Sequence, residues 1–241
     1  MPGPRSRFVD NDGVRLHVID SDPDDHSAAP VVFVPGMSDV AEDYVPVLDA
    51  FGRRTVVVDL RGHGPSDAPD DGYTLADRAR DIAAVVDATT DGPVHLVTFS
   101  RGTCYALRWA ADHRDRVRSL AIGDYPAREI ALPEESVASF VAGRWRGTPV
   151  ASRIREKAAR RIFHDAVDRP LWAELRALTV PLLVVRSTAE APLTDDDWAR
   201  YAAERPDAQL VEFTDSPHDI FRPERTRYPE LVRDHVEAAE V

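Results

Sequence analysis

Short, continuous apolar runs recur along the chain, separated by polar loops and by segments with helical periodicity. Runs of this kind are typical of strands that are buried on both faces of a parallel sheet. They occupy residues 31–34, 55–58, 94–97, 117–122 and 180–185, and a shorter run at 210–213 is typical of an edge strand. Because helical segments alternate with the runs, we predict an α/β fold with a mostly parallel, doubly wound sheet of about eight strands.

Two local signals refine this picture. Asn11-Asp12-Gly13 lies between two strand-like runs, and an Asp-Gly pair in that position predicts a tight hairpin turn. The clearest helix pattern covers residues 75–88, where apolar residues recur at helical spacing. Thr74 is expected to cap this helix, with Asp77 three residues later in a box-like arrangement.

Residues 125–179 interrupt the alternation of strands and helices, because they contain no strand-like run. Helix-like stretches such as 152–163 predict a helical insertion after the sixth strand. Open α/β sheets bind ligands at the carboxyl ends of their strands, and we expect this insertion to lie there as a cap or lid. The core would then comprise residues 1–124 and 180–241.

Composition narrows the possible partners. The 241-residue chain is 43 % apolar, which is sufficient for one substantial core. Its formal net charge of −12 disfavours nucleic acid and anionic membranes as partners. No apolar run is long enough to span a bilayer and no signal-peptide pattern precedes the first strand, so a cytoplasmic protein is expected. Metal-binding spacings are also missing from the sequence, and we expect neither a metal site nor a cofactor.

The pentapeptide Thr98-Phe99-Ser100-Arg101-Gly102 carries the strongest chemical signal. It follows an apolar strand-like run and precedes a helix-like stretch, which is the layout of a nucleophile elbow. Such a turn exposes the serine hydroxyl at the end of a sheet. A histidine, His218, follows the last strand-like run and could serve as the base that this hydroxyl needs.

The chain resembles the α/β-hydrolase family in five segments that occur in the family's order. They are the strand and turn at 31–37, the D-x-R-G-H-G-x-S loop at 59–66, the elbow at 98–102, the strand and acid loop at 181–190, and His218. The elbow departs from the family pattern at Thr98, where glycine is usual. The resemblance covers most of the chain outside the insertion.

The resemblance implies a triad in which Ser100 is the nucleophile and His218 the general base. It places Glu190 at the position of the orienting acid, where the family usually has Asp. Asp124, directly after the sixth strand, is the alternative acid. His63 belongs to a structural loop in the family, and Cys104 is expected to be a small buried residue and not a second nucleophile.

The same resemblance assigns the oxyanion hole to the backbone N–H groups of Met37 and Arg101. The Arg101 side chain would lie on the surface, pair with an acid of the insertion, or meet an anionic substrate. Apolar walls for the substrate are expected from Phe140, Trp145 and Trp172. Residues 143–161 are rich in arginine, which fits either a solvated face complementing an acidic body or attraction of an anionic or carrier-bound substrate.

Together these features predict a cofactor-free serine hydrolase that cleaves a small-molecule carboxylic ester, lactone or thioester through an acyl-enzyme. C–C hydrolysis, acyl transfer, perhydrolysis and biosynthetic cyclisation on the same site are the alternatives, because one fold supports many reactions. A non-catalytic ligand-binding homologue is a third hypothesis.

Overall fold

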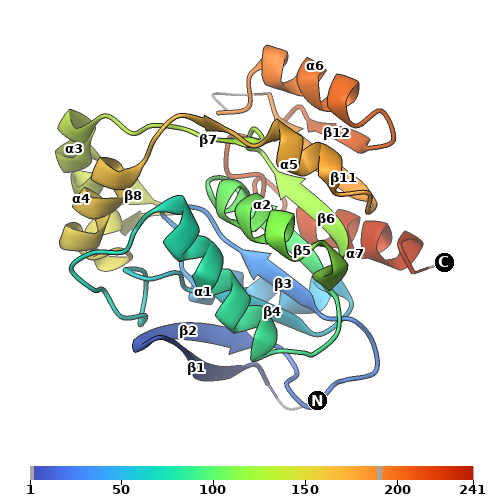
Figure 1. The fold of residues 1–241 in the computed structure, drawn as a ribbon, viewed down its shortest axis with the longest axis horizontal. Coiled ribbons are helices and arrows are strands. Elements are labelled where there is room, and N and C mark those ends of the chain that lie inside the picture. The colour runs from blue at the N-terminus through green and yellow to red at the C-terminus, as the bar shows by residue number, and fades with distance from the viewer. Residues whose placement is uncertain (1–2, 189–191, 241) are drawn as a thin grey trace.

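The computed structural model describes residues 3–188 and 192–240 and contains one eight-stranded sheet (Figure 1). The strand order is β1-β2-β4-β3-β5-β6-β11-β12. From β4 to β12 all neighbouring strands are parallel, whereas β2 is antiparallel to both β1 and β4. This arrangement confirms the predicted mostly parallel α/β sheet.

The strands of this sheet lie where the apolar runs predict them, including the β1–β2 hairpin and the edge strand β12. Their bounds are β1 (Arg5–Asn11), β2 (Val14–Asp20), β3 (Val31–Val34), β4 (Thr55–Val58), β5 (Val94–Phe99), β6 (Val117–Gly123), β11 (Leu182–Ser187) and β12 (Gln209–Phe213).

Helices alternate with these strands. The α-helices are α1 (Leu75–Asp87), α2 (Gly102–Asp112), α3 (Val137–Ala142), α4 (Glu156–Asp165), α5 (Trp172–Ala177), α6 (Asp195–Glu204) and α7 (Arg227–Ala238). Short 3₁₀ helices are η1 (Ala41–Phe51), η2 (Arg114–Arg116), η3 (Glu134–Ser136) and η4 (Val150–Ser152). The predicted capping box of α1 is present, because Asp77 N–H donates to Thr74 Oγ1 and Thr74 N–H donates to the Asp77 carboxylate.

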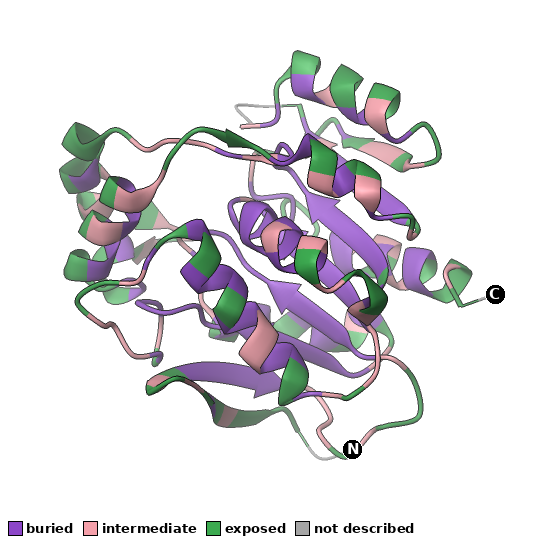
Figure 2. Ribbon diagram, viewed as in Figure 1, coloured by how far each residue is buried: buried purple, intermediate pink, exposed green. Residues whose placement is uncertain are grey.

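The strands are buried on both faces because adjacent side chains point to opposite sides of the sheet. On β3, Val32 and Val34 pack into one apolar cluster with α1, α2 and α5. Val31 and Phe33 pack into a second cluster with η1 and α7. Figure 2 shows the resulting buried central sheet between partly exposed helices.

The segment between β6 and β11 differs in detail from the prediction. It contains four two-residue strands, β7 (Arg128–Glu129), β8 (Arg144–Trp145), β9 (Thr148–Pro149) and β10 (Arg169–Pro170). Helices α3 and α4 form a third apolar cluster beyond the sheet. Helix α5 instead packs against α2 in the main core.

The predicted helix at 152–163 begins later, as α4 at Glu156. The reason is tertiary: Gly64 N–H donates to Arg153 O at 2.8 Å and Arg155 N–H donates to Gly62 O at 3.0 Å. These bonds tie residues 153–155 to the loop after β4 and prevent them from joining the helix. Within the described residues, no helix is both long and apolar enough to cross a bilayer.

Candidate active site

Ser100 lies at the sharp turn between β5 and α2, with a backbone φ of 51°. A positive φ is uncommon for a residue with a side chain and often marks a functional turn. The turn is tight enough that a Cβ on Gly102 would lie 2.3 Å from the carbonyl oxygen of Val34. Glycine at 102 therefore lets the start of α2 approach β3, as a nucleophile elbow requires.

Thr98 lies within β5, two residues before Ser100. Its side chain is buried, and its hydroxyl lies 2.9 Å from the hydroxyl of Thr103 and 3.3 Å from Ala121 O. Gly123 on the neighbouring strand allows the two backbones to approach closely here, because a Cβ on it would lie 2.9 Å from Thr98 O. The threonine that departs from the family pattern is thus accommodated by its partners.

His218 follows β12 and meets the serine, with its Nε2 2.9 Å from Ser100 Oγ. Its imidazole stacks on the ring of Phe99, with ring centres 5.2 Å apart and planes at 27°. The packing holds the imidazole in line with the hydroxyl. A base at this distance can accept the serine proton.

Asp124 meets the other side of the imidazole, with Oδ2 2.7 Å from His218 Nδ1. It directly follows β6, is fully buried, and has a φ of 53°. Ser187, at the end of the neighbouring strand β11, donates its N–H to Oδ1 at 2.9 Å and its hydroxyl to Oδ2 at 2.8 Å. The alternative acid of the sequence analysis therefore contacts the histidine, whereas the preferred Glu190 lies outside the described residues.

The predicted oxyanion-hole residues, Met37 and Arg101, both line the same cavity as Ser100. Gly36, just before Met37, approaches so closely that a Cβ on it would lie 2.9 Å from Ser100 Cβ. Arg101 follows Ser100 in the elbow. In the part of the chain that the structure describes, the backbone N–H groups of Met37 and Arg101 have no hydrogen-bond acceptor. They can therefore serve an oxyanion formed at Ser100.

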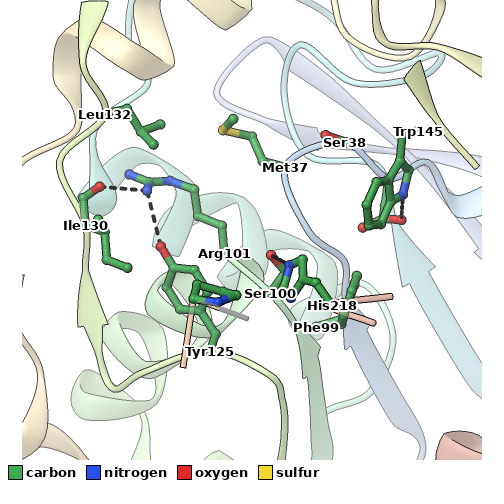
Figure 3. A pocket seen from close by; sticks show the side chains of 12 residues that line it. Met37, Ser38, Phe99, Ser100, Arg101, Tyr125, Ile130, Leu132, Trp145 and His218 are labelled. Atoms are coloured by element: carbon green, nitrogen blue, oxygen red, sulfur yellow. Dashed lines mark hydrogen bonds between the residues drawn. The ribbon is translucent and has the colours of Figure 1, made fainter. Parts of the chain in front are cut away.

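A cavity of about 480 Å³ opens onto Ser100 (Figure 3). Trp145 lines it, as predicted. Sequence reasoning missed Tyr125, Ile130 and Leu132, which also line it. Their position just after β6, at the carboxyl edge of the sheet, is the signal that would have found them.

The structure corrects the two other aromatic predictions. Phe140 packs within the α3–α4 cluster, where its ring centre lies 5.3 Å from that of Phe163. Trp172 is buried in the main core against Tyr201, with ring centres 4.9 Å apart. Neither lines the cavity, because α3 and α5 turn their apolar faces toward neighbouring helices.

The Arg101 side chain is not on the surface. It is 3 % exposed, and its guanidinium donates to Tyr105 Oη at 3.0 Å and Ile130 O at 2.7 Å. Glu129, within the insertion, lies 3.5 Å from its Nη2. The alternative in which Arg101 pairs with an acid of the insertion is therefore the one that the structure shows.

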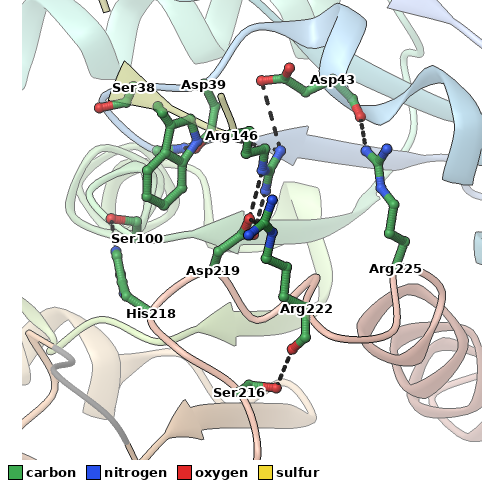
Figure 4. A network of polar contacts seen from close by, with 12 residues as sticks. Ser38, Asp39, Asp43, Ser100, Arg146, Ser216, His218, Asp219, Arg222 and Arg225 are labelled. Carbon is green, nitrogen blue, oxygen red and sulfur yellow. Dashed lines mark hydrogen bonds and ion pairs between the residues drawn. The ribbon is translucent and has the colours of Figure 1, made fainter. Parts of the chain in front are cut away.

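Several basic residues of the insertion bind the acidic body. Arg153 forms an ion pair with Asp43, and Lys157 forms one with Asp70 at 2.9 Å. Arg146 is largely buried and binds Asp219 through two hydrogen bonds of 2.9 and 2.7 Å (Figure 4). These contacts fit the complementary-face interpretation of the arginine-rich segment.

Asp39 links this network to the cavity. Its carboxylate accepts hydrogen bonds from Trp145 Nε1 at 2.8 Å and from Gly36 N–H at 3.1 Å, and it lies 3.3 Å from Arg146. Burial raises the pKa of Asp39, while the Arg146 charge opposes that shift. The cavity wall formed by Trp145 is thus tied to the turn that carries Met37.

The other predicted roles agree with the positions of His63 and Cys104. His63 contacts Met37 O at 2.8 Å, and burial lowers its pKa to about 4. It therefore supports the loop that carries Met37. Cys104 is fully buried, and burial raises its pKa to about 12, which disfavours a reactive thiolate.

The chain is similar to several known hydrolases. The chain is 27 % identical to a 2-(acetamidomethylene)succinate hydrolase from Mesorhizobium japonicum, over 89 % of each chain. It is similar in structure to an enol-lactonase from Burkholderia xenovorans LB400, with a TM-score of 0.80 at 21 % identity over 96 % of this chain and all of that one. An esterase from Rhodococcus gives a TM-score of 0.82 at 20 % identity over 99 % of this chain and 100 % of that one.

These relatives are hydrolases, which is consistent with a hydrolytic activity of this chain. The model of the alpha/beta hydrolase fold matches residues 29–149, a range that includes the first strand of the parallel sheet, the elbow and Asp124. The chain belongs to the α/β-hydrolase family.

Proposed function

We propose that this protein is a serine hydrolase that cleaves a carboxylic ester, lactone or thioester through an acyl-enzyme. The observation that carries the proposal is the continuous hydrogen-bonded chain from Ser100 through His218 to Asp124, with distances of 2.9 and 2.7 Å. Ser100 lines the cavity, so a substrate carbonyl can reach it. The enol-lactonase and esterase among the similar structures act, by their names, on ester bonds.

In the proposed reaction, Ser100 Oγ attacks the substrate carbonyl while His218 Nε2 takes its proton. The backbone N–H groups of Met37 and Arg101 stabilise the oxyanion that forms. His218 then gives the proton to the leaving group, and the acyl group stays on Ser100. A water molecule, deprotonated by His218, releases the acyl group in the second half of the reaction.

We assign the triad acid to Asp124. Its carboxylate accepts from Ser187 and faces His218 Nδ1, which fixes the tautomer that leaves Nε2 free to act as a base. We also propose that residues 125–179 form the cap. Trp145 reaches the cavity from this segment, while α3 and α4 lie beyond the sheet edge.

Intact-mass labelling with a neutral fluorophosphonate tests the proposal. Wild type should gain one label, whereas Ser100→Ala and His218→Ala should gain none, because the nucleophile needs its base. Ser38→Ala is the matched control, since Ser38 lines the same cavity but is not at the elbow. Hydrolysis of aryl esters, lactones and thioesters is then measured. A folded wild type that neither takes up the label nor hydrolyses any of them would refute the proposal.

A further inference from the structure

The cavity wall opposite His218 has an unusual charge arrangement. In Figure 3, Arg101, Tyr125, Ile130 and Leu132 lie on one side of Ser100, and His218 and Trp145 lie on the other. Arg101 is the only cation among the residues that line this cavity in the described parts of the chain, apart from the imidazole of His218. This wall therefore combines one positive charge with apolar and phenolic groups.

A second buried arginine lies behind this wall. Arg78, on α1, is fully buried, and none of its three guanidinium nitrogens has a hydrogen-bond partner among residues 3–188 and 192–240. Its guanidinium carbon lies 4.9 Å from the ring centre of Tyr105, and that of Arg101 lies 6.0 Å from the same ring. Tyr105 thus contacts both cations.

The buried charges of this wall do not balance. Arg78 and Arg101 contribute two positive charges, whereas Glu129 is the one carboxylate paired with either of them in the described residues. Burial raises the pKa of Glu129, which weakens its contribution further, and its Oε2 has no hydrogen-bond partner within that part of the chain. Buried charge without a partner is strongly unfavourable, so this wall favours an anion beside Arg101.

The position of the wall indicates which part of the substrate it meets. His218 protonates the leaving group, which must therefore depart on the side of His218. The acyl part then extends along the opposite wall, past Arg101 toward Ile130 and Leu132. In the described residues, Arg101 Nε donates to Tyr105 and Nη1 donates to Tyr125 and to Ile130 O. Nη2, 3.5 Å from Glu129, is therefore the nitrogen left to donate a charge-assisted hydrogen bond to a carboxylate.

We propose that the acyl part of the substrate carries a free carboxylate that binds Arg101, with Arg78 keeping this wall positive. The substrate class would be half-esters, or lactones with a pendant carboxylate, of dicarboxylic acids. This inference rests on the proposed function, because it assumes that the acyl group is delivered to Ser100. Arg101 would be the contacting residue and Arg78 a positioning residue that acts through the electrostatic field.

A binding measurement tests the inference without requiring turnover. Ser100→Ala is titrated with 4-nitrophenyl hydrogen adipate and with 4-nitrophenyl methyl adipate, which are nearly equal in shape but differ by one charge. We expect the acid to bind at least about tenfold more tightly, the size of effect expected from a charge-assisted hydrogen bond. Equal affinities, or tighter binding of the methyl ester, would overturn the inference whether or not the enzyme turns over either compound.

Arginine variants in the Ser100→Ala background locate the effect. Arg78→Met and Arg101→Lys should each reduce the ratio of the two affinities. Arg80→Met is the matched control, because Arg80 lies on the same helix with 60 % of its side chain exposed and pairs with Asp77. An Arg80→Met effect as large as that of Arg78→Met would reject the assignment to this wall.

The two proposals fail separately. Fluorophosphonate labelling of Ser100 uses a neutral probe, so it reports on the triad and not on the carboxylate site. If Ser100 is labelled but both adipates bind equally, the serine hydrolase proposal is supported and the anionic substrate class is rejected. If Arg78→Met does not fold, the affinity ratio of Ser100→Ala alone still decides the matter.

Discussion

At the scale of single residues, the identity of the triad acid depends on two neighbouring strand ends. Asp124 follows β6, and Ser187 ends β11, which pairs with β6. Asp124 N–H donates to Val185 O at 2.7 Å, so the left-handed backbone at 124 is anchored to the adjacent strand. The buried carboxylate is thereby directed at His218 and is held by both groups of Ser187.

Asp124→Asn should lower kcat on the order of a thousandfold or more, because an amide can no longer hold His218 in the productive tautomer. Steady-state kinetics on an aryl ester would measure this, with thermal unfolding as a check that the variant is folded. Glu190→Gln is the comparison and should lower kcat far less. The reverse order of effects would return the acid role to Glu190.

At the scale of elements, the β8–β9 hairpin connects the insertion to the catalytic loops. Arg146 and Gly147 form its two-residue turn with φ of 47° and 78°, as expected for a turn in which both central residues are left-handed. Arg146 packs over Tyr44 and Phe221, with its guanidinium carbon 5.0 and 5.2 Å from their ring centres. The turn therefore buries a charge where a hairpin tip is usually solvated.

Arg146→Met should reduce the free energy of unfolding by about 3 kcal/mol, because Asp39 and Asp219 would lose a buried counter-ion. We also expect a rise in KM, since Trp145 would lose the neighbour that fixes it against the cavity. Urea unfolding and kinetics would measure the two effects. Arg144→Met, two residues away and exposed, is the control and should change stability by less than about 0.5 kcal/mol.

At the scale of the whole molecule, stability should depend on pH through buried histidines. His95 on β5 is fully buried, with Nδ1 2.8 Å from Ser119 Oγ, and burial lowers its pKa from 6.5 to about 4. In the unfolded chain His95 is therefore protonated below about pH 6.5, whereas in the folded protein it is protonated only below about pH 4. This contribution favours the folded state above pH 6.5 and is lost as pH falls toward 4.

When the pH is lowered from 7 to 5, protonation of His95 in the unfolded chain should reduce the free energy of unfolding of wild type by about 2 kcal/mol. His95→Gln lacks this titration, so its stability relative to wild type should rise by that amount over the same range. Urea unfolding at several pH values would measure the difference. His164→Gln, at an exposed position on α4, should run parallel to wild type. A constant gap between His95→Gln and wild type would contradict the prediction.

The features that depend on local pattern were predictable from the sequence. Continuous apolar runs identify strands that are buried on both faces, and the elbow around Ser100 is a short strand-turn-helix motif. The start of α1 follows from Thr74 and Asp77, which lie three residues apart. In each case the signal is a pattern that lies within a few residues, so the sequence by itself determined these features.

Contacts between distant segments were decided only by the tertiary structure. Asp124 and His218 are 94 positions apart, and their contact depends on how the end of β6 faces the loop after β12. Trp145 rather than Trp172 reaches the cavity, because a hairpin extends to it while α5 packs on α2. The burial of Arg78 and Arg101 could not be predicted from the sequence either, because burial depends on which elements pack over a side chain and not on its neighbours in the sequence.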